Sequence, residues 1–280
     1  AAAAFLYPDY FTQIGSFQTK TLIIPLLMLI MFGMGTSMSV QDFKNVLQAP
    51  KGVFIGVLCQ FSIMPIVGLI ITQVFQFSPE IAAGIIMVGC SPSGLASNVM
   101  SYIAKANLAL SLTLTAVATL LAPLLTPFLM KLLADQYVPI DAVAMMLSIL
   151  KIVILPVIAG LAFNHLLKER GQWLKDAMPT VSMVSIALVI AVITAAGKDN
   201  LAAIGGVLVL ACFLHNSLGY ALGYSVARLF KMDTSSCRTI ALEVGMQNSG
   251  LASGIALEMG RMATMGLAPI VFGPLMNMTG

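Results

Sequence analysis

Long apolar stretches separated by short polar breaks run through this chain and limit the folds open to it. Apolar residues make up 59% of its 280 residues, charged residues make up 9%, and the mean hydropathy is +0.98. Soluble domains do not have this composition. A helix that crosses the hydrocarbon core of a bilayer needs about 20 apolar residues, and many of these stretches have that length. The sequence therefore predicts an all-α polytopic membrane protein.

The apolar stretches predict about ten transmembrane helices. We expect them near 1–7 (partial), 22–40, 52–75, 80–104, 107–130, 142–164, 178–197, 201–227, 236–258 and 262–280. The 13 prolines and 23 glycines favour kinked or broken helices over plain anchors. The chain opens inside the first stretch and stops inside the last, so we expect both of these helices to be truncated.

The basic residues between the stretches predict the orientation. One set of alternate loops, with their flanks, holds nine of them: Lys44, Lys51, Lys105, Lys168, Arg170, Lys175, Arg228, Lys231 and Arg238. The other set holds four: Lys20, Lys131, Lys198 and Arg261. Because cytoplasmic loops are enriched in Lys and Arg, we expect the richer set, and with it both termini, inside the cell. No basic tract indicates a nucleic-acid partner.

A short repeat divides the chain. The motif Ser-Gly-Leu-Ala-Ser occurs at 93–97 and again, 156 residues later, at 249–253. We expect two halves of five helices each, 1–140 and 141–280. Since five is an odd number, the second half would be inverted relative to the first, as in many secondary transporters.

Two amides have the same separation as the repeat: Gln60 in the third expected helix and Asn216 in the eighth. A match of five small residues can arise by chance. The amide pair makes chance a weaker explanation without excluding it.

Each copy of the repeated motif lies at an expected helix break. Residues 89–94 read Gly-Cys-Ser-Pro-Ser-Gly, and Gly245 and Gly250 flank the second site. Proline lacks an N–H, and glycine tolerates unusual dihedrals. A broken helix frees carbonyls that coordinate a hard cation and N-termini that face an anion. A plain kink would explain one break, whereas two at matching positions favour a binding site.

Glu243 is the one acidic residue expected well inside a transmembrane helix, just before the second break. A carboxylate in lipid is costly and by default marks an ion or proton site. It could instead be a structural hydrogen-bond partner, but the cost favours an ion ligand.

The fifth expected helix carries a polar stripe, because Asn107, Ser111, Thr115 and Thr119 follow one another at intervals of four residues. Hydroxyls in membrane helices often bond to carbonyls of their own helix. The alternative is that Ser111 and Thr115 face the first break. Uncharged oxygen ligands around one carboxylate would suit Na⁺.

Signatures of catalysis are poor, and no enzyme is expected. The sequence holds no HExxH, no P-loop and no GxSxG motif. An intramembrane hydrolase using Ser93 and His215 stays open as an alternative. The second alternative is a sodium/proton antiporter in which Na⁺ and H⁺ exchange at Glu243, although the sequence places no second acid near Glu243. A passive channel is disfavoured, because no ring of charges lines a helix.

The two break regions, 89–98 and 243–252, resemble the crossover motifs of the bile acid:sodium symporter family. Over nearly its whole length the chain is similar to the family's bacterial homologues of the apical sodium-dependent bile acid transporter. The resemblance implies ten helices in two inverted five-helix repeats. The first, second, sixth and seventh helices would form a panel, and the others a core in which the broken fourth and ninth helices cross.

The resemblance also implies two Na⁺ ions behind the crossing, with Glu243 shared by both sites. One site would use Ser97, Asn98, Ser111, Thr115 and Glu243. The other would use Gln60, Glu243, Gln247 and the carbonyls of Val244 and Met246. The substrate would lie between core and panel, near Leu95, Asn248 and Asn277.

This chain departs from some relatives in the expected substrate cavity. Leu95 stands where some have Thr, and Asn277 lies between Met276 and Met278 where some have His. The expected ion ligands are intact, so the sequence predicts sodium coupling more firmly than the identity of the substrate.

The resulting hypothesis is a multi-pass transporter of a bacterial inner membrane. It would carry a bile acid or a similar organic anion together with Na⁺ by alternating access. Its expected partners are the substrate, sodium and membrane lipid, and no obligate protein partner is evident.

Overall fold

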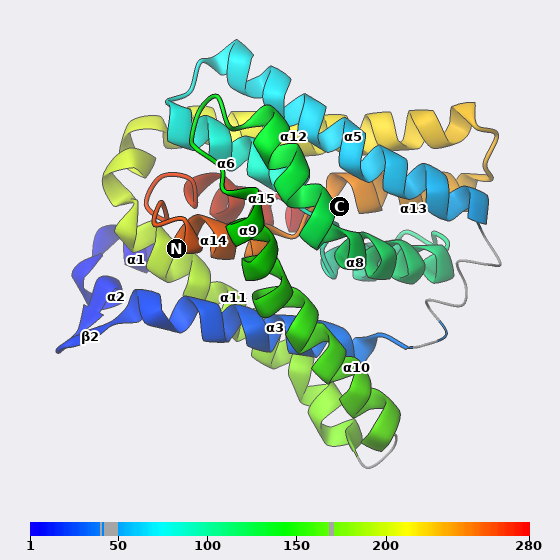
Figure 1. Cartoon of the computed structure of the whole chain (residues 1–280), viewed down its shortest axis with the longest axis horizontal. Coiled ribbons are helices and arrows are strands. Elements are labelled where there is room, and N and C mark those ends of the chain that lie inside the picture. The colour runs from blue at the N-terminus through cyan, green and yellow to red at the C-terminus, as the bar shows by residue number, and fades with distance from the viewer. Residues whose placement is uncertain (40, 42–49, 168–170) are drawn as a thin grey trace.

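The chain is almost wholly helical (Figure 1). The computed structural model describes residues 1–39, 41, 50–167 and 171–280. Three of the charges used to predict the orientation, Lys44, Lys168 and Arg170, lie outside them. The described elements are α1 (Ala2–Leu6), α2 (Asp9–Thr12), β1 (Gln13–Ile14), β2 (Phe17–Gln18), η1 (Thr19–Leu22), α3 (Ile23–Ser37), α5 (Pro50–Phe75), α6 (Pro79–Cys90), α7 (Ala96–Ile103), α8 (Leu108–Leu133), α9 (Ala142–Ile149), η3 (Leu150–Ile154), α10 (Leu155–Leu167), α11 (Gln172–Ala196), α12 (Lys198–Leu229), α13 (Thr234–Gly245), α14 (Ser249–Glu258) and α15 (Leu267–Thr279).

Six helical segments of the described chain are long and apolar enough to cross a membrane. They are Thr19–Ser37, Pro50–Phe75, Leu108–Leu133, Ala142–Leu167, Gln172–Ala196 and Lys198–Leu229. Each overlaps a stretch expected from the sequence, which confirms an all-α polytopic membrane protein. The largest difference is α11, which begins at Gln172 where the sequence predicted a start near 178. The count of ten and the inverted repeat stay predictions.

Both expected helix breaks are present. The first separates α6, which ends at Cys90, from α7, which begins at Ala96. The second separates α13, which ends at Gly245, from α14, which begins at Ser249. Ser91 has extended backbone angles (φ −75°, ψ 152°), as the residue before a proline prefers. The chain thus leaves the helix at the positions where Pro and Gly interrupt the sequence.

The two breaks lie against each other and pair through their backbones. Ser93 and Gln247 form an isolated antiparallel bridge. The N–H of Gly94 donates to the Met246 carbonyl at 3.0 Å, and the N–H of Asn248 donates to the Pro92 carbonyl at 2.8 Å. Peptide groups that leave a helix inside a membrane need partners, and each break supplies them to the other.

The helices gather in two groups on either side of a cavity. In Figure 1, α3, α10 and α11 lie together in the lower part of the view, while α5, α8, α12 and α13 lie above and behind them. The first group is closely packed where α3 crosses α10. A side chain on Gly35 would overlap the Val157 carbonyl, and one on Gly160 would overlap the Phe32 carbonyl. Small residues that let helix backbones touch are typical of membrane proteins.

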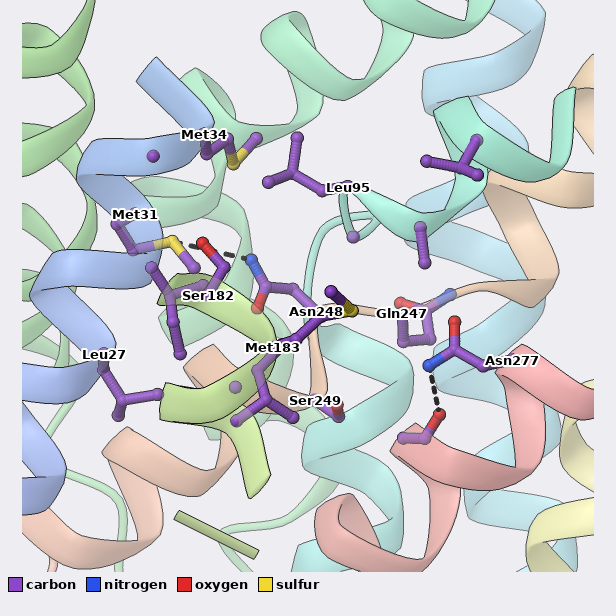
Figure 2. Close-up of a pocket in the computed structure, with 18 of the residues that line it drawn as sticks. Leu27, Met31, Met34, Leu95, Ser182, Met183, Gln247, Asn248, Ser249 and Asn277 are labelled. Atoms are coloured by element: carbon purple, nitrogen blue, oxygen red, sulfur yellow. Dashed lines mark hydrogen bonds between the residues drawn. The ribbon is translucent and has the colours of Figure 1, made fainter. Parts of the chain in front are cut away.

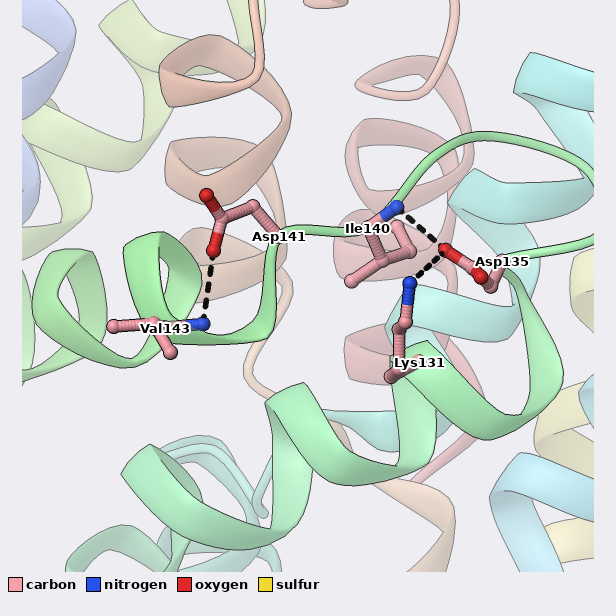
Figure 3. A network of polar contacts seen from close by, with 5 residues as sticks. All are labelled: Lys131, Asp135, Ile140, Asp141 and Val143. Carbon is pink, nitrogen blue, oxygen red and sulfur yellow. Dashed lines mark hydrogen bonds and ion pairs between the residues drawn. The ribbon is translucent and has the colours of Figure 1, made fainter.

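A polar turn joins α8 to α9, at the boundary expected between the two halves of the chain (Figure 3). Lys131 donates to Asp135 Oδ1 at 2.8 Å, and the N–H of Ile140 donates to the same oxygen at 2.8 Å. These two hydrogen bonds lower the pKa of Asp135 below its usual value. Asp141 then caps α9 by accepting from the N–H of Val143 at 3.1 Å.

Candidate functional site

The Glu243 carboxylate lies at the centre of a ring of hydroxyl groups. Glu243 is 2% exposed, and it is the one buried acidic residue among those that the structure describes. Ser97 and Ser111 each donate to its Oε1 at 2.6 Å, and Thr115 donates to its Oε2 at 2.9 Å. These three hydroxyls come from α7 and α8, so the carboxylate on α13 ties three helices together.

This ring contains more close oxygen contacts than it has hydrogens. Asn98 Oδ1 lies 2.8 Å from the Ser111 hydroxyl and 3.2 Å from the Thr115 hydroxyl. Ser97 Oγ also lies 2.7 Å from the Gly94 carbonyl. Together with the contacts to Glu243 these make six short oxygen–oxygen contacts, but three hydroxyls carry three hydrogens. A bound cation would relieve such a surplus of acceptors, so the residues fit Na⁺.

The residues expected to form a second ion site also meet, at the crossing of the breaks. Gln60 Nε2 donates to the Ser91 carbonyl at 2.9 Å and to Gln247 Oε1 at 2.8 Å. Gln247 Nε2 donates to the Val244 carbonyl, and the Met246 carbonyl accepts from the backbone of the first break. Gln60 Oε1 is buried and has no hydrogen-bond partner among the described residues.

The structure brings all nine expected ion ligands to this region. A hard cation such as Na⁺ is held by oxygen atoms, and each of these residues offers one. No group of three or more His, Cys, Asp or Glu side chains that would suit a transition metal occurs in the described part of the chain.

Two further polar residues hold the ends of the broken helices in place. Asn216 Nδ2 donates to the Gly245 carbonyl at 2.9 Å, at the end of α13. Thr126 donates to the Cys90 carbonyl at 2.7 Å, at the end of α6. Gln60 donates to the Ser91 carbonyl at the first break as Asn216 does to the Gly245 carbonyl at the second. The two amides with the separation of the repeat therefore each bind a carbonyl at one break. Thr126 was missed, although it lies seven residues, or two helical turns, beyond Thr119 and continues the polar stripe.

The ends of the predicted stripe do not reach the carboxylate. Asn107 caps α8 by accepting from the N–H of Leu110 at 3.1 Å. The hydroxyl of Thr119 is buried and has no hydrogen-bond partner among the residues described. Only Ser111 and Thr115 contact Glu243, because they are the two that lie level with the end of α13.

His215 is a packing residue in this structure. Its Nε2 lies 2.9 Å from the Met64 carbonyl, and its ring packs edge-on against Phe272 with centroids 5.6 Å apart. No hydrogen bond joins it to Ser93 within the described residues. A serine nucleophile needs such a contact with its base, so this geometry does not favour the hydrolase.

A cavity of about 470 Å³ lies between α3 and α11 on one side and the two breaks on the other (Figure 2). All three expected substrate residues, Leu95, Asn248 and Asn277, line it. Asn248 caps α14 by accepting from the N–H of Leu251 at 3.0 Å, and Asn277 Nδ2 donates to the Gly273 carbonyl at 2.9 Å.

The cavity wall is mostly apolar and carries no charged side chain among the described residues. Methionines are prominent in it: Met31, Met34, Met38, Met178, Met183 and Met276. Polar character comes from small uncharged groups and from α7 and α14, whose N-terminal ends face the cavity. Such a wall fits an amphipathic molecule, whose negative end would be favoured at the helix N-termini.

Comparison with known proteins places the chain in a family. Residues 24–204 match the model of the sodium bile acid symporter family. The chain is 39% identical over 256 residues to the uncharacterized sodium-dependent transporter YocS of Bacillus subtilis, covering 91% of this chain and 78% of that protein.

More distant relatives carry more specific names. The probable chloroplastic sodium/metabolite cotransporter BASS1 of Arabidopsis thaliana is 38% identical over 233 residues, covering 83% of this chain and 58% of the plant protein. The human ileal sodium/bile acid cotransporter is 31% identical over 263 residues, covering 88% of this chain and 71% of that protein. The match to the family model and these relatives confirm the resemblance drawn from the two motifs: the chain belongs to the sodium bile acid symporter family, a family of sodium-dependent membrane transporters.

Proposed function

We propose that this protein is a secondary active transporter of a bacterial inner membrane that carries a bile acid or a similar organic anion together with Na⁺. The observation that carries the proposal is the ring around Glu243. The three hydroxyls around this buried carboxylate make six short oxygen contacts, three of them to Glu243, with only three hydrogens to share. The ring is therefore a poor hydrogen-bond network and a good cation site.

Two sodium ions bind behind the crossing in this proposal. The first is held by Ser97, Asn98, Ser111, Thr115 and Glu243. The second is held by Gln60, Glu243, Gln247 and the carbonyls of Val244 and Met246. Since Glu243 is common to both, its single negative charge couples the two ions.

The organic anion binds in the cavity beside Leu95, Asn248 and Asn277. Its hydrocarbon part packs against the methionine-rich wall, and its negative group lies near the N-terminal ends of α7 and α14. The names of relatives support this substrate class, because they include a sodium/bile acid cotransporter and a probable sodium/metabolite cotransporter.

Transport follows from movement of two groups of helices, with both termini in the cytoplasm. The chain is built from inverted halves, 1–140 and 141–280, and each half gives its first two helices to a panel and the next three to a core. Bound Na⁺ joins α5, α7, α8 and α13 of the core and shapes the anion site. Coupling requires that Na⁺ prefers the conformation that binds substrate, because a ligand shifts an equilibrium only by its differential affinity.

Uptake of radiolabelled taurocholate into proteoliposomes tests the proposal, with an inward Na⁺ gradient compared with K⁺. We expect uptake by the native chain in Na⁺ alone and none by Glu243→Ala, because that variant loses a ligand of both ions. Asp176→Asn is the matched control: this carboxylate is exposed on α11 and accepts from Gln172, so its loss should leave uptake unchanged.

Full Na⁺-driven uptake by Glu243→Ala would disprove the assignment of Glu243. If the folded native chain takes up no taurocholate but is stabilised against heat by Na⁺, the substrate is a different anion. If it shows neither response, the symport proposal fails.

A further inference from the structure

The hydroxyl of Ser93 is a buried polar group for which the proposed sodium sites have no use. Ser93 is 1% exposed, and its Oγ has no hydrogen-bond partner among the described residues. Buried polar groups nearly always have a partner, so an orphan at a functional site needs an explanation. This hydroxyl lies near the Glu243 carboxylate, outside the geometry of a hydrogen bond.

The backbone fixes the position of this side chain. Both neighbours of Ser93 in the chain are hydrogen-bonded to the second break. The Pro92 carbonyl accepts from the N–H of Asn248, and the Gly94 N–H donates to the Met246 carbonyl. The antiparallel bridge to Gln247 holds Ser93 itself. Because both neighbours are tied, the Ser93 hydroxyl can reach only the groups that surround this point of the crossing.

A second oxygen without a partner among the described residues belongs to Gln60, which hydrogen-bonds to the Gln247 side chain. Gln60 binds the Gln247 side chain and the Ser91 carbonyl through its Nε2, so its amide group is fixed and its Oε1 is left without a donor. Gln247 is therefore contacted by both residues, by Ser93 through its backbone and by Gln60 through its side chain. The two unpartnered oxygens belong to one small region beside Glu243.

We propose that Ser93 is an additional sodium ligand of the second site, where its Oγ acts with Gln60 Oε1 and the Glu243 carboxylate. The inference rests on the proposed function and adds a ligand to it. The Val244 and Met246 carbonyls already accept hydrogen bonds from Gln247 Nε2 and from the first break. Side-chain oxygens without partners are thus the ones most available to a hard cation.

Burial without a partner is not enough to make a ligand, and Ser101 shows the difference. Its hydroxyl on α7 is also fully buried and unpartnered among the described residues, but it lies about one helical turn beyond Ser97, farther from the break. Ser101→Ala is therefore the matched control for Ser93→Ala. Both variants remove one buried hydroxyl and no hydrogen bond.

The test is thermal unfolding of the purified protein in detergent as NaCl replaces KCl at constant ionic strength. The rise in Tm with Na⁺ gives an apparent affinity. We expect Ser93→Ala to weaken that affinity by about fivefold, the order expected for losing one typical polar contact. Ser101→Ala should match the native chain. An unchanged affinity in Ser93→Ala, or an equal loss in both variants, would overturn the inference.

Double variants assign the ligand to one ion. If Ser93 and Gln60 share the second ion, the loss caused by Ser93→Ala should be smaller in a Gln60→Ala background than in a Thr115→Val background. Equal losses in both backgrounds would overturn the assignment. Failure of the sodium proposal itself looks different, because the native chain would then show no Na⁺-dependent rise in Tm at all.

Discussion

At the scale of single residues, the hydroxyls around Glu243 are not equivalent. Ser97 and Ser111 both contact Oε1, whereas Thr115 is the one described hydroxyl with a hydrogen bond to Oε2. Oε1 keeps a donor when one serine is lost, whereas loss of the Thr115 hydroxyl leaves Oε2 without a donor among the described residues. Thr115 therefore fixes the rotation of the carboxylate.

Thr115→Val tests this difference, because it keeps the shape of the side chain and removes the hydroxyl. We expect the apparent Na⁺ affinity in uptake to fall by about tenfold, a loss of about 1.4 kcal/mol that is close to the lower end of the range for a hydrogen bond to a charged group. Thr72→Val is the control, since the buried Thr72 hydroxyl donates to the Leu69 carbonyl of its own helix and to no other described group. Equal Na⁺ dependence in the two variants would contradict the role given to Thr115.

The sequence was informative about this site where a residue is costly in a membrane. Glu243 could be predicted because a carboxylate is energetically costly in an apolar stretch and is therefore rarely kept there without a function. The roles of Ser93 and Thr126 could not be predicted, because hydroxyls in membrane helices often bond to carbonyls of their own helix. Whether a hydroxyl instead reaches another helix depends on which helix packs beside it, and the spacing of residues along the chain does not show this.

At the scale of elements, the ends of the broken helices depend on side chains from other helices. Pro and Gly made the two breaks predictable from local backbone preferences. Their pairing was not predictable, because it joins residues far apart in the chain. The repeat relates Ser93 to Ser249, but Ser93 pairs with Gln247, two residues earlier. The offset of a repeat identifies equivalent residues and does not identify contacting ones.

Thr126→Val should destabilise the end of α6. The Cys90 carbonyl is held by the Thr126 hydroxyl at 2.7 Å inside the protein, and leaving a buried acceptor unpaired costs about 1–3 kcal/mol. We expect a Tm several degrees lower at saturating Na⁺. Ser225→Ala, which removes an exposed hydroxyl bonded to its own helix, should not change the Tm. If the Tm of Thr126→Val is native, the break is held by backbone pairing alone.

At the scale of the whole molecule, the cavity extends along α3 and α11 to Ser37 and Met178, and a separate contact joins the two helix groups near α9. There α14, from the second break, packs against α9. Ser148 on α9 donates to Glu258 Oε2 at the end of α14, at 3.3 Å. In the proposed mechanism this contact joins panel to core and separates when the transporter changes state.

Cross-linking across this contact should stop transport. A Ser148→Cys, Glu258→Cys double variant treated with a short, cleavable thiol-reactive linker is expected to lose Na⁺-driven uptake and to regain it on reduction. The four native cysteines are buried, which limits background reaction. The two single variants, treated in the same way, should keep their uptake. Undiminished uptake by the linked protein would show that α9 and α14 do not separate.

The pairing of the two breaks is made by peptide groups and not by side chains. Its two hydrogen bonds need an N–H at Gly94 and at Asn248, which any residue except proline supplies. The pairing itself therefore places few demands on side chains, although Gly94 must stay small because a Cβ there would lie 3.0 Å from the Gln247 carbonyl oxygen. Cavity-lining side chains beside the pairing, such as Leu95 and Ser249, can differ without loss of its two hydrogen bonds. In the proposed mechanism, a change of substrate therefore needs no change in the peptide groups that join the two broken helices.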